Sequence, residues 1–227
     1  MLAIKTLMAC AALAAAMPAM ASKVTLDFET LPNATRVGEA YKDLGIHFSS
    51  NAFNFVSKDG SCGGPGNFFD LTNTHSIGCN AIELYTGSTS GPTGASFYIT
   101  VDTGFTGPFS LVYTATSAGT VSLYDSLAFL TDPDARPLSN ERALSPQPTT
   151  DCILSGFQCI WDTKTVELGA QTAKYVVISG INGSMFLDNI TFGNVNDAGG
   201  TVPEPSGVAL SLAALGALAY TRKRVQR

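Results

Sequence analysis

The sequence predicts an all-β protein, an antiparallel two-sheet β-sandwich of jelly-roll-like type. Two observations favour this fold class. About ten short runs of strand-forming residues follow one another, and most intervals between them contain Gly, Pro, Asn or Asp. Charged residues make up only 14% of the 227 positions while glycine supplies 22, a balance that disfavours a helix-rich enzyme. A closed barrel is the alternative architecture.

The first strand is expected at 24–29, where apolar Val24, Leu26 and Phe28 alternate with polar residues. Further strands are expected, in chain order, at 45–49, 53–57, 81–86, 95–101, 109–116, 120–124, 164–168, 174–179 and 184–192. They form one domain over residues 22–193, followed by a flexible linker at 194–201. Two segments have the composition of insertions: 58–78 is rich in Gly and Asn, and 131–161 holds four prolines.

Residues 1–21 have the composition of a signal peptide. Lys5 precedes an apolar Ala/Leu run, and small residues at Ala19 and Ala21 precede the expected cleavage site. We therefore expect signal peptidase to cut after Ala21, so that the mature chain begins at Ser22.

The segment 202–227 combines a Pro-Glu-Pro triplet, a short apolar stretch and a basic end. The apolar stretch at 207–220 would form a hydrophobic helix of roughly 21 Å, shorter than the ~30 Å core of a bilayer. Four Arg and Lys residues follow it, and they would hold the C-terminus on the cytoplasmic side. The stretch is thus expected to insert transiently in the inner membrane, with the domain outside.

This C-terminus resembles the PEP-CTERM sorting signal of exopolysaccharide-producing Gram-negative bacteria. The resemblance rests on the motif Pro203, Glu204 and Pro205, the transmembrane helix and the basic tail, in that order. It implies processing near the motif by an exosortase and then transfer to the cell surface or secretion, in the setting of a biofilm. A plain C-terminal anchor is the alternative and would leave the same domain outside.

Four cysteines remain after removal of the signal peptide, and an even number in an exported chain predicts disulfide bonds. Three pairings are open. We favour Cys62 with Cys79 and Cys152 with Cys159, because each pair closes a local loop inside one of the insertions. Neither spacing is the one typical of a zinc site.

Residues 22–201 carry eight basic and seventeen acidic side chains, a net charge of −9. Such a surface repels nucleic acid and anionic lipid, and it is compatible with neutral glycans or divalent cations.

The two ends of the domain resemble those of extracellular jelly-roll modules such as MAM domains and carbohydrate-binding modules. The resemblance is carried by the strand with Asp27 and Glu29 and by the last strand with Asp188-Asn189. In those families the matching acids help to hold a structural calcium ion, so Asp27, Glu29 and Asp188 are candidate Ca²⁺ ligands. The alternative is that these acids are solvated residues of strand faces and turns.

No sequence pattern points to catalysis, and we expect no enzyme activity. His47 lies between apolar residues of a strand and is expected to be structural, while His75 is expected at the surface of a loop. Candidate glycan contacts are Tyr85, Tyr124 and Trp161, because sugar rings stack on exposed aromatic side chains.

The sequence thus predicts an exported, non-catalytic cell-surface or matrix protein associated with exopolysaccharide. The alternatives are a carbohydrate-binding module with structural calcium and, third, a polysaccharide hydrolase built on a pair of carboxylates.

Overall fold

The computed structural model describes residues 22–58, 62–69, 75–85, 95–132, 134–139, 141–148, 158–180 and 183–195. The predicted signal peptide, Cys152, most of the predicted linker and the predicted sorting motif Pro203-Glu204-Pro205 lie outside these ranges. The strands of the described ranges are β1 (Ser22–Leu26), β2 (Thr35–Arg36), β3 (Ile46–Phe48), β4 (Ala52–Val56), β5 (Asn80–Leu84), β6 (Ala95–Thr106), β7 (Phe109–Ala115), β8 (Gly119–Tyr124), β9 (Arg142–Leu144), β10 (Asp162–Val166), β11 (Ala173–Gly180) and β12 (Met185–Val195), with 3₁₀ turns η1 (Lys42–Leu44) and η2 (Leu127–Leu130). None of the described helical turns is long and apolar enough to cross a membrane.

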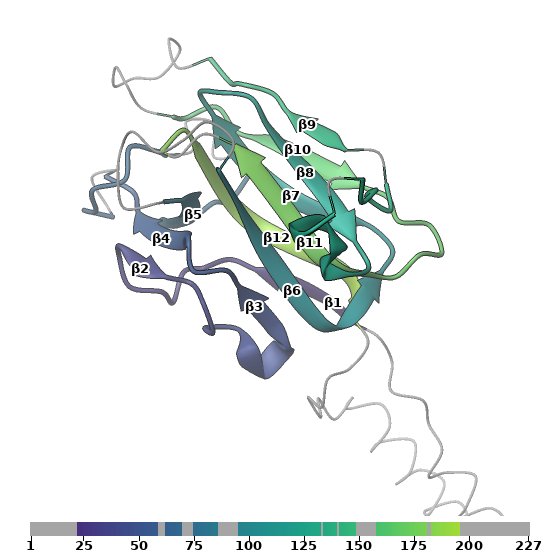
Figure 1. The fold of residues 1–227 in the computed structure, drawn as a ribbon. Helices are drawn as coiled ribbons and strands as arrows, with labels where there is room; N and C mark the ends of the chain where they lie inside the picture. Colours follow the sequence, from purple (N-terminus) through teal and green to yellow (C-terminus); the bar gives the residue numbers. More distant parts are fainter. Residues whose placement is uncertain are drawn as a thin grey trace, which may run out of the picture. The chain divides into compact units, whose positions relative to one another are not determined.

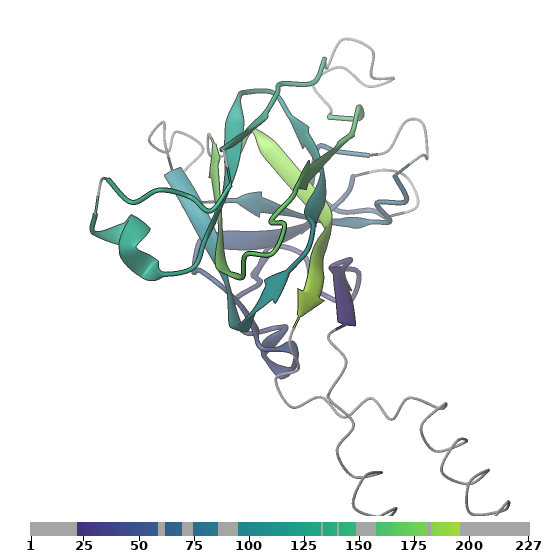
Figure 2. The ribbon, with the colours of Figure 1, turned by 90° about the vertical axis from the view of Figure 1, so that its right-hand side faces the viewer.

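The strands form an antiparallel β-sandwich, which confirms the predicted fold class (Figures 1 and 2). One layer has the order β2-β4-β5-β12-β7-β10, and the other has the order β3-β6-β11-β8-β9. β1 pairs with β12, and the end of β12 also bonds to the end of β6, so the two layers are joined at one corner.

The main hydrophobic core fills the space between the layers. Alternate residues along each strand point inward, for example Ile82 and Leu84 from one layer and Ile99 and Val176 from the other. The core is rich in phenylalanine, and the Phe105 and Phe192 rings meet edge to face with centroids 5.2 Å apart. This burial is the main source of stability.

The two predicted insertions supply a second apolar cluster on the outer face of β5, β12 and β7. Phe68 and Ile77 come from the first insertion and Trp161 from the second, and they pack on Phe186 and its neighbours. The Trp161 Nε1–H donates to the carbonyl oxygen of Phe69 at 3.0 Å, and a parallel bridge joins Phe68 to Gln158. The described ends of both insertions are therefore packed against the sheet, whereas their composition alone suggested polar loops.

Several predicted boundaries are wrong. β1 ends at Leu26 and not at Glu29, because Phe28 has a left-handed φ of 58°, which lies outside the β region. β12 continues to Val195, two residues into the predicted linker. The second insertion contains β9, a three-residue strand that pairs with β8, and its pattern is too short to see in the sequence.

The predicted disulfide between Cys62 and Cys79 is confirmed, with Cα atoms 5.5 Å apart. Cys159 is also disulfide-bonded; its expected partner, Cys152, lies outside the described ranges. The Cys62–Cys79 bond joins the first insertion to the residue that precedes β5.

Replacement of both Cys62 and Cys79 by serine is expected to lower the free energy of unfolding by about 3 kcal/mol, because the bond closes a loop of 17 residues and so restricts the unfolded chain. Urea denaturation of the variant and the wild type measures the difference. A change below about 0.5 kcal/mol would mean that the second apolar cluster alone holds the insertion.

Candidate functional site

The last strand buries a carboxylic acid, Asp188, at a point where its pairing is irregular. The register between β12 and β7 shifts between Asp188 and Thr191. Asp188 is only 1% exposed, and neither of its carboxyl oxygens has a hydrogen-bond partner of normal geometry. A buried polar group without a partner costs stability, so its presence at an irregular strand position marks this place as a candidate site.

Two residues with left-handed backbone flank this acid in space. Phe28 has a φ of 58° and Asn189 a φ of 49°. Asn189 suits this conformation, and its side-chain amide donates to the carbonyl oxygens of His75 and Ser76 at 3.0 and 3.3 Å. The strain at the bulky Phe28 is offset by its complete burial against Tyr41 and Phe48.

The turn at Phe28 directs Glu29 onto the start of β5. The Glu29 carboxylate accepts main-chain N–H bonds from Cys79 and Asn80 at 3.0 and 2.9 Å. Gly78 makes this contact possible: it has a φ of 57°, and a Cβ there would lie 2.3 Å from the Glu29 Oε1 atom. Asn80 ties the other side of the turn by donating its side-chain amide to the Phe28 carbonyl at 2.9 Å.

The strongest electrostatic effect at this site is the burial of the Asp188 carboxyl group. Burial raises the pKa of Asp188 to about 9, and the negative charges of Glu29 and Asp27 contribute in the same direction. Burial and the nearby Asp27 likewise raise the pKa of the Tyr41 hydroxyl to about 12. The three acids predicted from the two ends of the sequence are therefore close enough to interact.

The oxygen atoms at this place are of the type that Ca²⁺ prefers. Asp188 offers a carboxylate with no competing partner, and Glu29 and Asp27 stand at the surface beside it. In the described part of the chain, no three His, Cys, Asp or Glu side chains are gathered closely enough to hold a metal ion. A bound Ca²⁺ would therefore need main-chain carbonyl oxygens as further ligands.

The three candidate glycan contacts lie in three different places. Trp161 is 5% exposed in the second apolar cluster, so its expected role as an exposed stacking surface is wrong. Tyr85 is half-buried beside Phe53 and Phe55, with ring centroids 5.3 and 5.8 Å away. Tyr124 is half-buried on β8 in the other layer, beside Phe129.

His47 makes a contact that sequence reasoning missed. Its two ring nitrogens lie 2.6 Å from Glu39 and 3.2 Å from Asp102. The hydrogen bond with Glu39 is the largest cause that raises the pKa of His47 above its ordinary value. Asp102 is on β6, 55 residues away, so only strand pairing shows this arrangement. It fits the structural role expected for His47.

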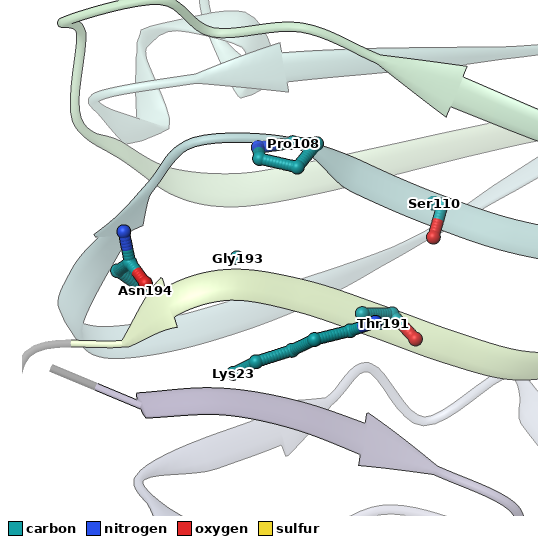
Figure 3. Close-up of a pocket in the computed structure, with 6 residues that line it drawn as sticks. All are labelled: Lys23, Pro108, Ser110, Thr191, Gly193 and Asn194. Atoms are coloured by element: carbon teal, nitrogen blue, oxygen red, sulfur yellow. The ribbon is translucent and has the colours of Figure 1, made fainter.

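A shallow hollow of about 180 Å³ lies where β1 meets β12 (Figure 3). It is lined by Lys23, Pro108, Ser110, Thr191, Gly193 and Asn194. None of the residues predicted to form a site lines it.

No protein-family model matches the chain, and no curated protein matches its sequence. Among solved structures, it is similar to the K2 cleaved adhesin domain of Lys-gingipain, with 16% identity over 75% of this chain and 99% of that one and a TM-score of 0.46. It is similar to a mutant family 29 carbohydrate-binding module complexed with mannohexaose, with 11% identity over 77% and 92% and a TM-score of 0.39. A Cellvibrio mixtus lichenase 5A carbohydrate-binding module in complex with cellotriose gives 12% identity over 78% and 98% and a TM-score of 0.32. What these domains bind is a property of those proteins.

Asp188→Asn is expected to stabilise the metal-free protein at pH 8 by several kcal/mol. Because the folded-state pKa of Asp188, about 9, lies above the ordinary value of 3.8 for an aspartic acid, its contribution to stability is complete below about pH 4 and is lost as the pH rises toward 9. Asparagine keeps the shape and removes this dependence. Denaturant unfolding with a chelator present, at pH 5 and pH 8, measures it. Asp27→Asn, at an exposed position, is the control, and an equal response of both variants would contradict the prediction.

Proposed function

We propose that the chain is an exported, non-catalytic cell-surface or extracellular-matrix protein that a PEP-CTERM signal delivers into an exopolysaccharide layer. The observation that carries the proposal is the three-part C-terminus, Pro203-Glu204-Pro205, an apolar stretch and a basic tail, combined with an N-terminal signal peptide. Signal peptidase and exosortase are then its processing partners, and insertion in the inner membrane is transient.

The arrangement of the first and last strands supports this proposal. Ser22 pairs with Val195 at the ends of β1 and β12, so both sorting segments attach at one edge of the domain. From Val195 to Pro203 the chain has eight further residues, which span at most about 28 Å when extended. Processing near Pro203 would therefore leave the folded domain intact and would take place close to its β1–β12 edge.

Two further features agree with a stable exported module. The Cys62–Cys79 disulfide is a bond that persists in oxidising compartments. The two acids with the most strongly raised pKa values, Asp188 and Glu83, are only 1% and 6% exposed, so a polymer substrate would not reach them as it would reach the carboxylate pair of a hydrolase. Burial explains their pKa values without a catalytic role.

The proposal predicts the mass of the protein recovered from the surface and medium of its native host. The polypeptide should begin at Ser22 and end near Pro203, because the two proposed peptidases act at these positions. Intact-mass measurement with and without reduction checks both ends and the number of disulfides. A mass that still includes the residues up to Arg227 would contradict the sorting proposal and would indicate a permanent C-terminal anchor.

A second candidate function is favoured by the buried carboxylate of Asp188, which a structural Ca²⁺ would neutralise. Asp188 and Glu29 would hold the ion together with main-chain carbonyl oxygens, with Asp27 nearby, since no three acidic side chains of the described residues gather around one point. The ion would stabilise the junction of β1, β5 and β12. Calcium would then be part of the fold of the exported module and not of a reaction.

The calcium proposal predicts stabilisation by about 2.7 kcal/mol in 10 mM Ca²⁺, roughly one hundred times the dissociation constant of about 0.1 mM found for extracellular sites. Because Asp188 must lose its proton to bind the ion, binding at pH 7 should release a proton and should be weaker at pH 5. Calorimetric titration in two buffers of different ionisation enthalpy measures both effects. Asp188→Asn should abolish them, and an unchanged response in that variant would place any bound calcium elsewhere.

A further inference from the structure

The two outer faces of the sandwich differ in how the described residues cover them. The insertions and the second apolar cluster cover the face of β5, β12 and β7. Among the described residues, the outer face of β6, β11 and β8, which lie side by side in Figure 1, is contacted by the turn η2. Figure 2 shows the η2 coil at the side of this layer, and the Phe129 ring of η2 contacts a tyrosine of each strand.

Strand register arranges nine side chains on this second face in three rows, which we call the tyrosine face. Each row takes one residue from β8, one from β11 and one from β6, and side chains directly opposite each other share a face. The rows are Tyr124, Tyr175 and Thr100; Ser122, Val177 and Tyr98; and Thr120, Ser179 and Ser96. The grid measures roughly 10 Å across the strands by 13 Å along them, which matches a few sugar rings in a chain.

The three tyrosines form one aromatic group around Phe129 of η2. The ring centroid of Phe129 lies 4.9 Å from Tyr124, 5.8 Å from Tyr175 and 6.0 Å from Tyr98. All four rings are half-buried, so each is held by packing and still presents part of its surface to solvent. Rings held in this way lose little conformational entropy on binding.

Eight of the nine side chains of the tyrosine face are half-buried or exposed, and Ser122 is buried, with 5% exposure. The hydroxyls of Tyr98, Tyr124 and Tyr175 make no hydrogen bond to another described residue. The other positions are Ser and Thr, apart from Val177, and none of the nine side chains is charged at neutral pH. Ionisable side chains border the face: His47 and Asp102 lie next to Thr100, and the exposed Asp125 and Lys174 are chain neighbours of Tyr124 and Tyr175.

We propose that the tyrosine face binds a strand of neutral polysaccharide. The C–H faces of sugar rings would pack on the exposed parts of the tyrosine and phenylalanine rings, and the tyrosine, serine and threonine hydroxyls would exchange water for sugar hydroxyls. A polyanion is disfavoured by the net charge of −9 carried by residues 22–201. A polycation would be drawn to the acidic side chains elsewhere and not to nine uncharged ones.

Two other occupants agree less well with these residues. A lipid surface or a second copy of the chain would favour a continuous apolar patch, whereas the apolar surface here is limited to the ring edges, Val177 and two exposed leucines of η2, Leu127 and Leu130. The proposal deepens the proposed function, on which it rests for its exopolysaccharide setting. The two proposals are tested separately, because glycan binding can be measured whether or not the chain ends are cut as proposed.

The experiment is affinity electrophoresis of the full chain from Ser22 in native gels that contain glucomannan, hydroxyethylcellulose or, as the anionic comparison, alginate. The wild type should be retarded by at least one neutral polymer and not by alginate. Tyr124→Ala and Tyr175→Ala should each weaken binding about tenfold, because each removes one stacking ring. Phe53→Ala, which removes a half-buried aromatic ring from β4 in the other layer, is the matched control and should bind as the wild type does.

Ser96→Glu keeps the inference testable if loss of a tyrosine prevents folding. It adds a larger, charged side chain at an exposed position of the third row and should weaken binding with the sandwich intact. Loss of binding in Phe53→Ala with normal binding in Tyr124→Ala would overturn the inference, as would absence of retardation by any neutral polymer. Self-association in sedimentation that Leu130→Asp abolishes, without glycan binding, would assign this face to a second copy. Correct processing without glycan binding would leave the proposed sorting intact and remove only this inference.

Discussion

The pairing of the first strand with the last is the contact on which the rest of this structure depends. β1 hydrogen-bonds along β12 from Ser22–Val195 to Leu26–Ile190, which closes the sandwich and brings residues 22 and 195 together. The same pairing carries Glu29 and Asp27 to Asp188, about 160 residues further along the chain. Because β12 also contacts β5, β6 and β7, a change in the register of β12 would displace the core. It would also displace the place where Asp188, Glu29 and Asp27 meet, which we call the acid site.

The acid site contains two locally unfavourable features that the surrounding residues stabilise. A bulky residue in a left-handed conformation and a buried carboxylate without partners would each be unfavourable alone. Phe28 is fixed by its burial among aromatic rings, and the turn that it makes lets Glu29 accept two main-chain bonds from the start of β5. Asp188 then keeps its proton at neutral pH, because burial raises its pKa to about 9, and a bound cation would take the place of that proton.

The insertions give the two outer faces of the sandwich different roles. Phe68, Ile77 and Trp161 bury one outer face and are fastened there by the Cys62–Cys79 bond. The opposite face keeps its hydroxyl and tyrosine side chains beside the single turn η2. A sandwich of this kind can hold its shape through two apolar clusters and leave one uncharged face for contact with the material around it.

The fold class, most of the strands and the Cys62–Cys79 pair could be predicted from the sequence. Alternation of apolar residues and the closing of a local loop are properties of neighbouring residues, so both are visible without a structure. The sequence also named the three acids, through a resemblance of the two chain ends. The sequence did not predict that Asp188 is buried while Asp27 is exposed, or that Trp161 packs in the second apolar cluster. Nor did it predict that Tyr124, Tyr175 and Tyr98 share one face. Burial and cross-strand neighbours depend on register and on which segment covers which face, and these are set by contacts between residues far apart in the chain.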